Sequence, residues 1–288
     1  SCGGKHSLYN ACQVLFQAGD EVIIFSPYWV SFPDFVAVTG AKPVIVKTDS
    51  SRQFEPDFDD LKAKITSSTR GIIINSPSNP TGGVWTDDAV LQVLELARDA
   101  DAWIFSDECY EQLTYDQPYL STAKLAEKND KVLTFQSCSK TYAMTGWRIG
   151  YTAGDRDVIK AMGKLQGQST SCPTSISQVA AIEALTGDQS EVGHMREEFK
   201  KRRDYIVDRL NRMDGVSCIT PGGAFYVFPD FSSHMGEDAK IKCSNDLSMY
   251  LLKEKSVVTV SGDAFGGEGH VRFSYAASND DLRRAMDF

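Results

Sequence analysis

The sequence predicts an α/β fold, with a mostly parallel sheet flanked by helices in a large domain and a smaller α+β domain after it. The chain has 288 residues, which is long for one core and suits two unequal domains. Short, almost continuously apolar runs alternate with helical patterns in the first half. After about Asp155 this alternation gives way to a long polar helix and scattered short strands. We therefore place the large domain in residues 1–165 and the remainder in 166–288, with the small domain itself starting near residue 190.

The strands expected in the first half are runs rich in β-branched and aromatic residues, bounded by Gly, Pro, Asn or Asp. Apolar side chains that follow one another without alternation indicate strands buried on both faces of a parallel sheet. We expect strands at Glu21–Ser26, Pro43–Lys47, Gly71–Asn75, Ala102–Ser106, Val132–Gln136 and Ile149–Ala153. The intervening helices are expected at His6–Ala18, Phe58–Ile65 and Asp87–Asp99.

The second half begins its own pattern with a long helix whose central Arg/Lys run indicates a solvated face. The expected helices are Ser190–Met213 and Asn245–Glu254, and the expected strands are Val216–Thr220, Ala224–Phe228, Val257–Val260 and His270–Tyr275. The last ten residues also have a helical pattern. Because the chain starts at Ser1 inside a Gly-Gly motif, we expect the natural protein to continue beyond both ends of this sequence.

Composition excludes several function classes. The 39 acidic and 30 basic side chains give a formal charge of −9, which argues against a nucleic-acid partner. No apolar run approaches the ~20 residues of a membrane span. The seven cysteines are scattered and odd in number, which is typical of reduced thiols in the cytoplasm. Four isolated histidines lack metal-ligand spacing, so we expect no metal, no membrane contact and a cytoplasmic location.

Polar residues follow three of the predicted parallel strands, at the sheet edge where open α/β sheets bind ligands. Asn79 lies in "NSPSNPTGG", Asp107 and Tyr110 in "FSDECYEQL", and Lys140 in "QSCSK". Each has an ordinary structural interpretation, as an Asx turn, a helix cap, a packed phenol or a surface lysine. The functional alternative is an amide, an acid and a phenol around a heteroaromatic ring, with a lysine that forms a Schiff base with an aldehyde.

A phosphate site is the functional interpretation of two further segments. The Gly-Gly turn that includes Gly4 and precedes Lys5 opens a helix, whose first backbone N–H groups can bind an anion. Ser137, Ser139 and Arg148 lie on either side of Lys140 and offer two hydroxyls and a guanidinium.

Two large side chains complete the candidates. Trp29, in "SPYWVSF", is either a core residue or a platform on which a planar cofactor stacks. Arg272, in "HVRFSYA", lies within a predicted strand of the small domain. An arginine there is either paired with a core carboxylate or binds a ligand carboxylate through its planar fork.

Taken in order, the motifs N-P-T-G, D-x-x-Y, S-x-S-K, an arginine eight residues after the lysine, and R-x-S resemble the class I aminotransferases. These are fold-type I enzymes that depend on pyridoxal 5′-phosphate (PLP). The resemblance extends over essentially the whole chain. The bacterial aspartate aminotransferase branch is the most similar, judging by "SPYWVSF", "NSPSNPTGG" and "AMTGWRIGY".

The resemblance implies roles for the catalytic residues. Lys140 would bind PLP as a Schiff base and later move the proton between the substrate Cα and the cofactor. Asp107 would pair with the pyridine nitrogen, which makes the ring an electron sink. Tyr110 and Asn79 would donate hydrogen bonds to the ring oxygen, and Trp29 would stack on the ring.

The remaining roles concern the phosphate and the substrate. Arg272 would bind the substrate α-carboxylate, in a pocket also lined by Asn79, Trp29 and Phe225. The phosphate would be held by Gly4, Lys5, Ser137, Ser139 and Arg148.

The reaction implied is a ping-pong transfer of an amino group between an L-amino acid, aspartate or another, and a 2-oxo acid such as 2-oxoglutarate. The resemblance also implies a homodimer with the active site near the subunit interface, and an N-terminal arm that this sequence lacks. Alternatives within the same chemistry are an aminotransferase for aromatic or other amino acids and a PLP lyase. A different class is the effector-sensing domain of a transcription regulator built on an aminotransferase-like fold.

Overall fold

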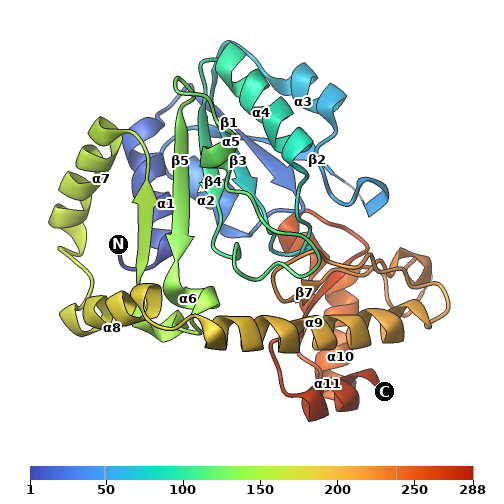
Figure 1. Ribbon diagram of the computed structural model, residues 1–288. Helices are drawn as coiled ribbons and strands as arrows, with labels where there is room; N and C mark the ends of the chain where they lie inside the picture. The colour runs from blue at the N-terminus through green and yellow to red at the C-terminus, as the bar shows by residue number, and fades with distance from the viewer. Residues whose placement is uncertain (49, 238, 288) are drawn as a thin grey trace.

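The fold is built on one large sheet and one small sheet, seen in the computed structural model that describes residues 1–48, 50–237 and 239–287 (Figure 1). The large sheet is parallel except at one edge, where its last strand runs antiparallel to its neighbour. The α/β fold class predicted from the sequence is therefore confirmed. Its six strands lie in the order β2 (Lys42–Lys47), β1 (Glu21–Ser26), β3 (Thr69–Asn75), β4 (Trp103–Asp107), β5 (Val132–Ser137) and β6 (Gly150–Ala153).

The strand predictions for this sheet hold to within two residues at each end. β1 agrees at both ends, since its apolar run is bounded by Asp20 and Pro27. The central strands β3 and β4 are largely buried, as their unbroken apolar sequences predicted. β4 and β5 each continue one residue further than expected, to Asp107 and Ser137. Asp107 and Ser137 are therefore the last residues of their strands and do not lie in the loops that follow.

Helices cover both faces of the large sheet. Apolar side chains of α1 (Gly4–Leu15), α2 (Ser31–Ala37) and α7 (Arg156–Ser169) form one core with Phe105 and Phe135 of the sheet. On the other face lie α3 (Phe58–Lys64), α4 (Asp87–Asp99) and α5 (Thr122–Leu125). Figure 1 shows α1 and α7 on the left of the sheet and α3 and α4 at its upper right.

The small sheet has three short antiparallel strands in the order β7 (Tyr226–Val227), β9 (Val271–Ser274) and β8 (Val260–Ser261). It packs against a single core shared with three helices, α9 (Ser190–Asn211), α10 (Ser244–Lys255) and α11 (Asn279–Met286). Figure 1 shows α9 as a long rod that runs from α8 (Ser175–Thr186) to this second sheet. The α+β character predicted for the second half is present.

The strand predicted at Val216–Thr220 is wrong. Within that segment, only Ser217 forms an isolated bridge, with Asp230. The side-chain amide of Asn211, at the end of α9, bonds both the N–H and the C=O of Cys218, at 2.8 and 2.9 Å. Because these backbone groups are already satisfied by a side chain, they do not form a sheet ladder.

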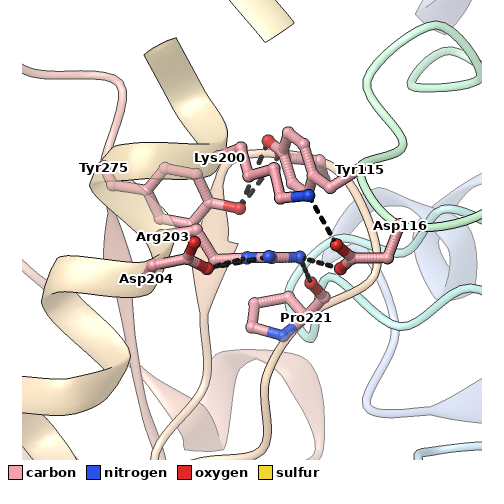
Figure 2. Close-up of polar contacts among 8 residues, drawn as sticks. Tyr115, Asp116, Lys200, Arg203, Asp204, Pro221 and Tyr275 are labelled. Carbon is pink, nitrogen blue, oxygen red and sulfur yellow. Dashed lines mark hydrogen bonds and ion pairs between the residues drawn. The ribbon is translucent and has the colours of Figure 1, made fainter. Parts of the chain in front are cut away.

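A buried arginine joins α9 to the loop that follows β4 (Figure 2). The Arg203 side chain is 4% exposed. It donates to the Asp116 carboxylate, to the Pro221 carbonyl at 3.0 Å and to Asp204 at 2.7 Å. Lys200 binds the other oxygen of Asp116 at 2.9 Å. The loop that begins at the carboxyl end of β4 is thus fixed to the helix that carries the small sheet.

No helix in the described part of the chain combines the length and the apolar character that crossing a membrane requires.

Candidate active site

A cavity of about 430 Å³ opens at the carboxyl ends of β3, β4 and β5. Every residue predicted for the site lines it except Phe225. The structure therefore brings together side chains that are up to 268 residues apart in the chain, from Gly4 to Arg272. They meet because parallel strands present their carboxyl ends at one sheet edge, and the small sheet closes over that edge.

Lys140 lies in the single-turn helix α6 (Cys138–Thr141), directly after β5. Its Nζ is 5.8 Å from the ring centre of Tyr110 and 5.4 Å from that of Phe225. Burial lowers the pKa of the Lys140 amine, and the nearby charges of Arg272 and Arg148 lower it further. The amine is thus more readily neutral than an exposed lysine, as a nucleophile or a proton acceptor must be.

Asp107 ends β4 and is buried at the base of the cavity. Its carboxylate accepts the backbone N–H of Cys109 at 3.3 Å, and burial raises its pKa to about 6. Asn75 fixes the surroundings, since its amide donates to the Asp107 carbonyl at 3.1 Å and its oxygen accepts the Asn79 N–H at 2.9 Å. A carboxylate in this position is stabilised as an anion by a cationic partner such as a protonated pyridine.

The features of an anion site gather at the start of α1. No side chain among the described residues caps this helix, and its first turn contains no acid. Gly3, with φ +89°, lies so near Arg148 that an added Cβ would be 2.4 Å from Nη2 of the guanidinium. The hydroxyl of Ser137 donates to that of Ser139 at 2.8 Å, and a Cβ on Gly4 would contact Ser137 at 3.3 Å. An open helix start, two hydroxyls and a guanidinium are a fitting set for a phosphate.

Trp29 forms part of the cavity wall and packs edge-on against Phe32 and Phe35, with ring centres 5.3 and 5.8 Å apart. The Lys5 Nζ lies 4.8 Å from the Trp29 ring centre. The prediction gave Lys5 a backbone role only, and the structure adds this side-chain contact. The indole is held by its neighbours and presents a flat surface in the cavity.

Arg272 enters the cavity from β9 of the small sheet. Its guanidinium donates to Asn79 Oδ1 at 2.7 Å, and its carbon lies 4.4 Å from the Tyr226 ring centre and 4.9 Å from that of Phe265. Its Nε is buried without a hydrogen-bond partner among the described residues. Of the two interpretations offered by the sequence, the structure therefore favours a cation that binds a carboxylate from a ligand.

Phe225 is a correction to the predicted lining. Tyr226, one residue later, lines the cavity instead. Phe225 lies in the turn before β7, and its ring centre is 5.5 Å from that of Tyr110 and 5.4 Å from Lys140 Nζ, so it packs against residues that line the cavity. Phe225 packs against Phe199 and Tyr226, with ring centres 5.5 and 4.8 Å apart.

Other lining residues were also missed. Asn75 is the last residue of β3, as Asp107 is of β4, so its position at a strand end was a usable signal. Cys109 lies between Asp107 and Tyr110, two residues that were predicted for the site, so its place in the sequence was also a signal. Leu8 and Thr145 line the cavity without such a signal.

A family model described as "Aminotransferase class I and II" matches residues 1–288. The chain belongs to this aminotransferase family. The predicted enzyme class is thereby confirmed: the protein is a PLP-dependent aminotransferase that moves an amino group between an amino acid and a 2-oxo acid.

Similar proteins bear related names. An aspartate/prephenate aminotransferase of Cereibacter sphaeroides is 45% identical, over 98% of this chain and 72% of its own length. The aspartate aminotransferase of Bacillus subtilis is 42% identical, over 99% of this chain and 73% of its own. The crystal structure of the aspartate aminotransferase from Rhizobium meliloti superposes with a TM-score of 0.94 at 41% identity, covering all of this chain and 74% of that one.

The cavity of this aminotransferase suits PLP on its own geometry. A buried acid, a lysine with lowered pKa and an anion-binding helix start line one cavity, as a protonated ring, an aldehyde and a phosphate require. The names of the relatives are those of enzymes, so the alternative of a regulatory sensor domain receives no support from them.

Proposed function

We propose that this aminotransferase uses L-aspartate as amino donor and 2-oxoglutarate as acceptor. The observation that carries the proposal is the amine of Lys140, which has a lowered pKa and shares one cavity with the Asp107 carboxyl and the partly unpaired Arg272 guanidinium. The choice of aspartate is supported by the relatives, which are named aspartate or aspartate/prephenate aminotransferases.

We assign the chemistry to residues as follows. Bound PLP supplies an electron sink for charge that develops at the substrate Cα. Lys140 would hold PLP through its amine, and that amine, once free, would accept the proton from the substrate Cα and carry it to the cofactor. Asp107 would keep the pyridine nitrogen protonated. Tyr110 and Asn79 would donate hydrogen bonds to the ring oxygen, and Trp29 would offer a surface for stacking.

Binding of the two anionic groups is divided between Arg272 of the small sheet and residues of the large domain. Arg272 binds the substrate α-carboxylate through two parallel N–H groups, with Asn79 and Trp29 beside it. The phosphate is bound by the helix start and the strand-end residues Gly4, Lys5, Ser137, Ser139 and Arg148.

We further propose a homodimer, supported by an apolar stripe on α8. Ile176, Val179 and Ile182 are 71%, 66% and 63% exposed and recur every three residues along the helix. An exposed apolar surface of this kind is typical of an interface. Figure 1 shows α8 at the lower left periphery of the molecule.

Two coarser assignments complete the proposal. The large PLP-binding domain comprises residues 1–165, and the remainder, 166–288, is mainly the small domain. A cytoplasmic location is supported by the seven cysteines, all of which are free thiols.

The test is an assay of purified full-length protein, loaded with PLP, against a panel of amino acids and oxo acids. We expect aspartate with 2-oxoglutarate to give the highest kcat/KM, and prephenate is included because one relative is named for it. Lys140→Ala should abolish turnover, whereas Lys164→Ala, which changes an exposed lysine of α7, should not. Preference for an aromatic amino acid, or turnover by Lys140→Ala, would overturn the corresponding assignment.

A further inference from the structure

One cavity residue, Tyr226, contacts two groups that have separate roles in the proposed reaction. Its hydroxyl lies 3.1 Å from the hydroxyl of Tyr110, and both groups are buried. The face of its ring lies 4.4 Å from the guanidinium carbon of Arg272. The sequence motifs did not include Tyr226, and it lines the cavity beside both partners.

We propose that Tyr226 is a positioning residue that orients the Tyr110 hydroxyl toward the cofactor and holds the Arg272 guanidinium flat for the substrate carboxylate. The inference rests on the proposed function, because it deepens the roles assigned there to Tyr110 and Arg272.

Sheet register explains how Tyr226 reaches Arg272. Tyr226 of β7 is paired with Ser274 of the antiparallel strand β9. Arg272 is two residues before Ser274, so it lies diagonally opposite Tyr226 on the same face of the sheet. A planar cation beside an aromatic ring is attracted by the ring's negative face.

The guanidinium has a second ring beside it, that of Phe265 at 4.9 Å. Asn79 accepts one of its N–H groups at 2.7 Å, and Nε has no partner among the described residues. Two rings near the guanidinium limit its rotation, and its remaining donors stay available for a carboxylate. A bidentate grip needs this fixed orientation, because both N–H groups must meet both oxygens at once.

The contact between the Tyr226 and Tyr110 hydroxyls requires one of them to donate and the other to accept. A phenol has one proton to donate, and it can also accept. If Tyr110 donates its proton to the cofactor ring oxygen, it can only accept from Tyr226, so Tyr226 must be the donor of the pair. Burial raises the pKa of Tyr226, so its hydroxyl keeps the proton that it donates to Tyr110.

The prediction for the hydroxyl concerns the pH at which the bound cofactor changes its absorbance. A hydrogen bond from Tyr226 to Tyr110 strengthens the hydrogen bond that Tyr110 donates to the cofactor ring oxygen. This stabilises the ring oxygen most when the imine between Lys140 and the cofactor has lost its proton. Tyr226→Phe removes that donor, so the absorbance midpoint should rise by ~0.5–1 pH unit. Tyr110→Phe, which removes the direct donor, should raise it further, and Tyr250→Phe on α10 serves as the matched control.

The prediction for the ring concerns the binding of succinate, a dicarboxylate that cannot be transaminated. Tyr226→Phe keeps a ring next to the guanidinium, so the Kd of succinate should change by less than about twofold. Tyr226→Leu removes the ring, and the Kd should rise ~5–30-fold, the range of a desolvated cation–π contact. Titration calorimetry of the PLP-loaded protein measures both values.

The two readouts separate positioning from a general structural role. An unchanged absorbance midpoint in Tyr226→Phe, or wild-type succinate affinity in Tyr226→Leu, overturns the proposal. Equal changes of both readouts in both variants, following a drop in Tm, would assign Tyr226 a structural role instead. If the wild-type protein itself neither binds PLP covalently nor transaminates, the proposed function fails, an outcome distinct from these three.

Discussion

Replacing Arg272 with lysine keeps a positive charge in the cavity but removes the planar fork. The arginine donates to Asn79 at 2.7 Å and lies against two aromatic rings at 4.4 and 4.9 Å. Lysine forfeits one of two charge-assisted bonds to the substrate carboxylate, ~1.5–3 kcal/mol, and part of the ring contact, ~0.5–1 kcal/mol. Together these predict a loss of ~2–4 kcal/mol, or ~30–1000-fold in kcat/KM.

The assay is steady-state kinetics with aspartate and 2-oxoglutarate on protein whose PLP content has been measured. Arg283→Lys on α11 is the matched control, because this arginine is exposed and, within the described chain, forms an ion pair with the nearby Asp280 at 3.5 Å. A loss below about threefold would refute the assignment of Arg272 to the carboxylate. A loss that merely follows lower PLP content would point to a role in folding.

Three further predictions test other parts of the structure. Asp107→Asn should lower kcat ~100-fold or more at unchanged fold, because an amide cannot hold the pyridine nitrogen in its cationic state; circular dichroism and kcat check it. Gly3→Ala should weaken PLP binding, because the added Cβ would lie 2.4 Å from Nη2 of Arg148 and would force the guanidinium to move; dialysis against PLP-free buffer measures how much PLP the protein retains. Asp116→Asn should lower the free energy of unfolding by ~1 kcal/mol near pH 7, because Arg203 loses one of its two ionic partners and keeps Asp204, and this value is reduced for the roughly half-exposed carboxylate. The pKa of Asp116 falls from 3.8 to about 2 on folding, so this stabilisation is complete above about pH 5 and is lost progressively as the pH falls through about 2, which urea unfolding at several pH values detects.

The large sheet was predictable because burial on both faces leaves a direct mark on the sequence. β1 and β3 are unbroken apolar runs, and the chemistry-bearing residues follow such runs. Once parallel strands are inferred, their carboxyl ends must converge, so Asp107 and Lys140 could be placed in one site before any contact was known.

The misses have local physical causes. α8 was not predicted because its own apolar side chains lie on both its buried and its exposed sides, Ala181 on the first and Ile176 and Val179 on the second, which removes the one-sided periodicity of a surface helix. The second half depends on side-chain contacts that no pattern records, such as the Asn211 amide that occupies the backbone of Cys218. At the site, Tyr226 was missed in favour of Phe225, which lies in the turn before β7, because a strand of two residues shows no alternation in the sequence.

The most direct test of the central claim identifies the lysine that binds PLP. Protein loaded with PLP is reduced with borohydride, which makes the linkage permanent, and its peptides are mapped by mass spectrometry. We predict a pyridoxyl group on the peptide that contains Lys140, and none on any peptide of Lys140→Ala. A label on Lys5, the other lysine that lines the cavity, would contradict the account.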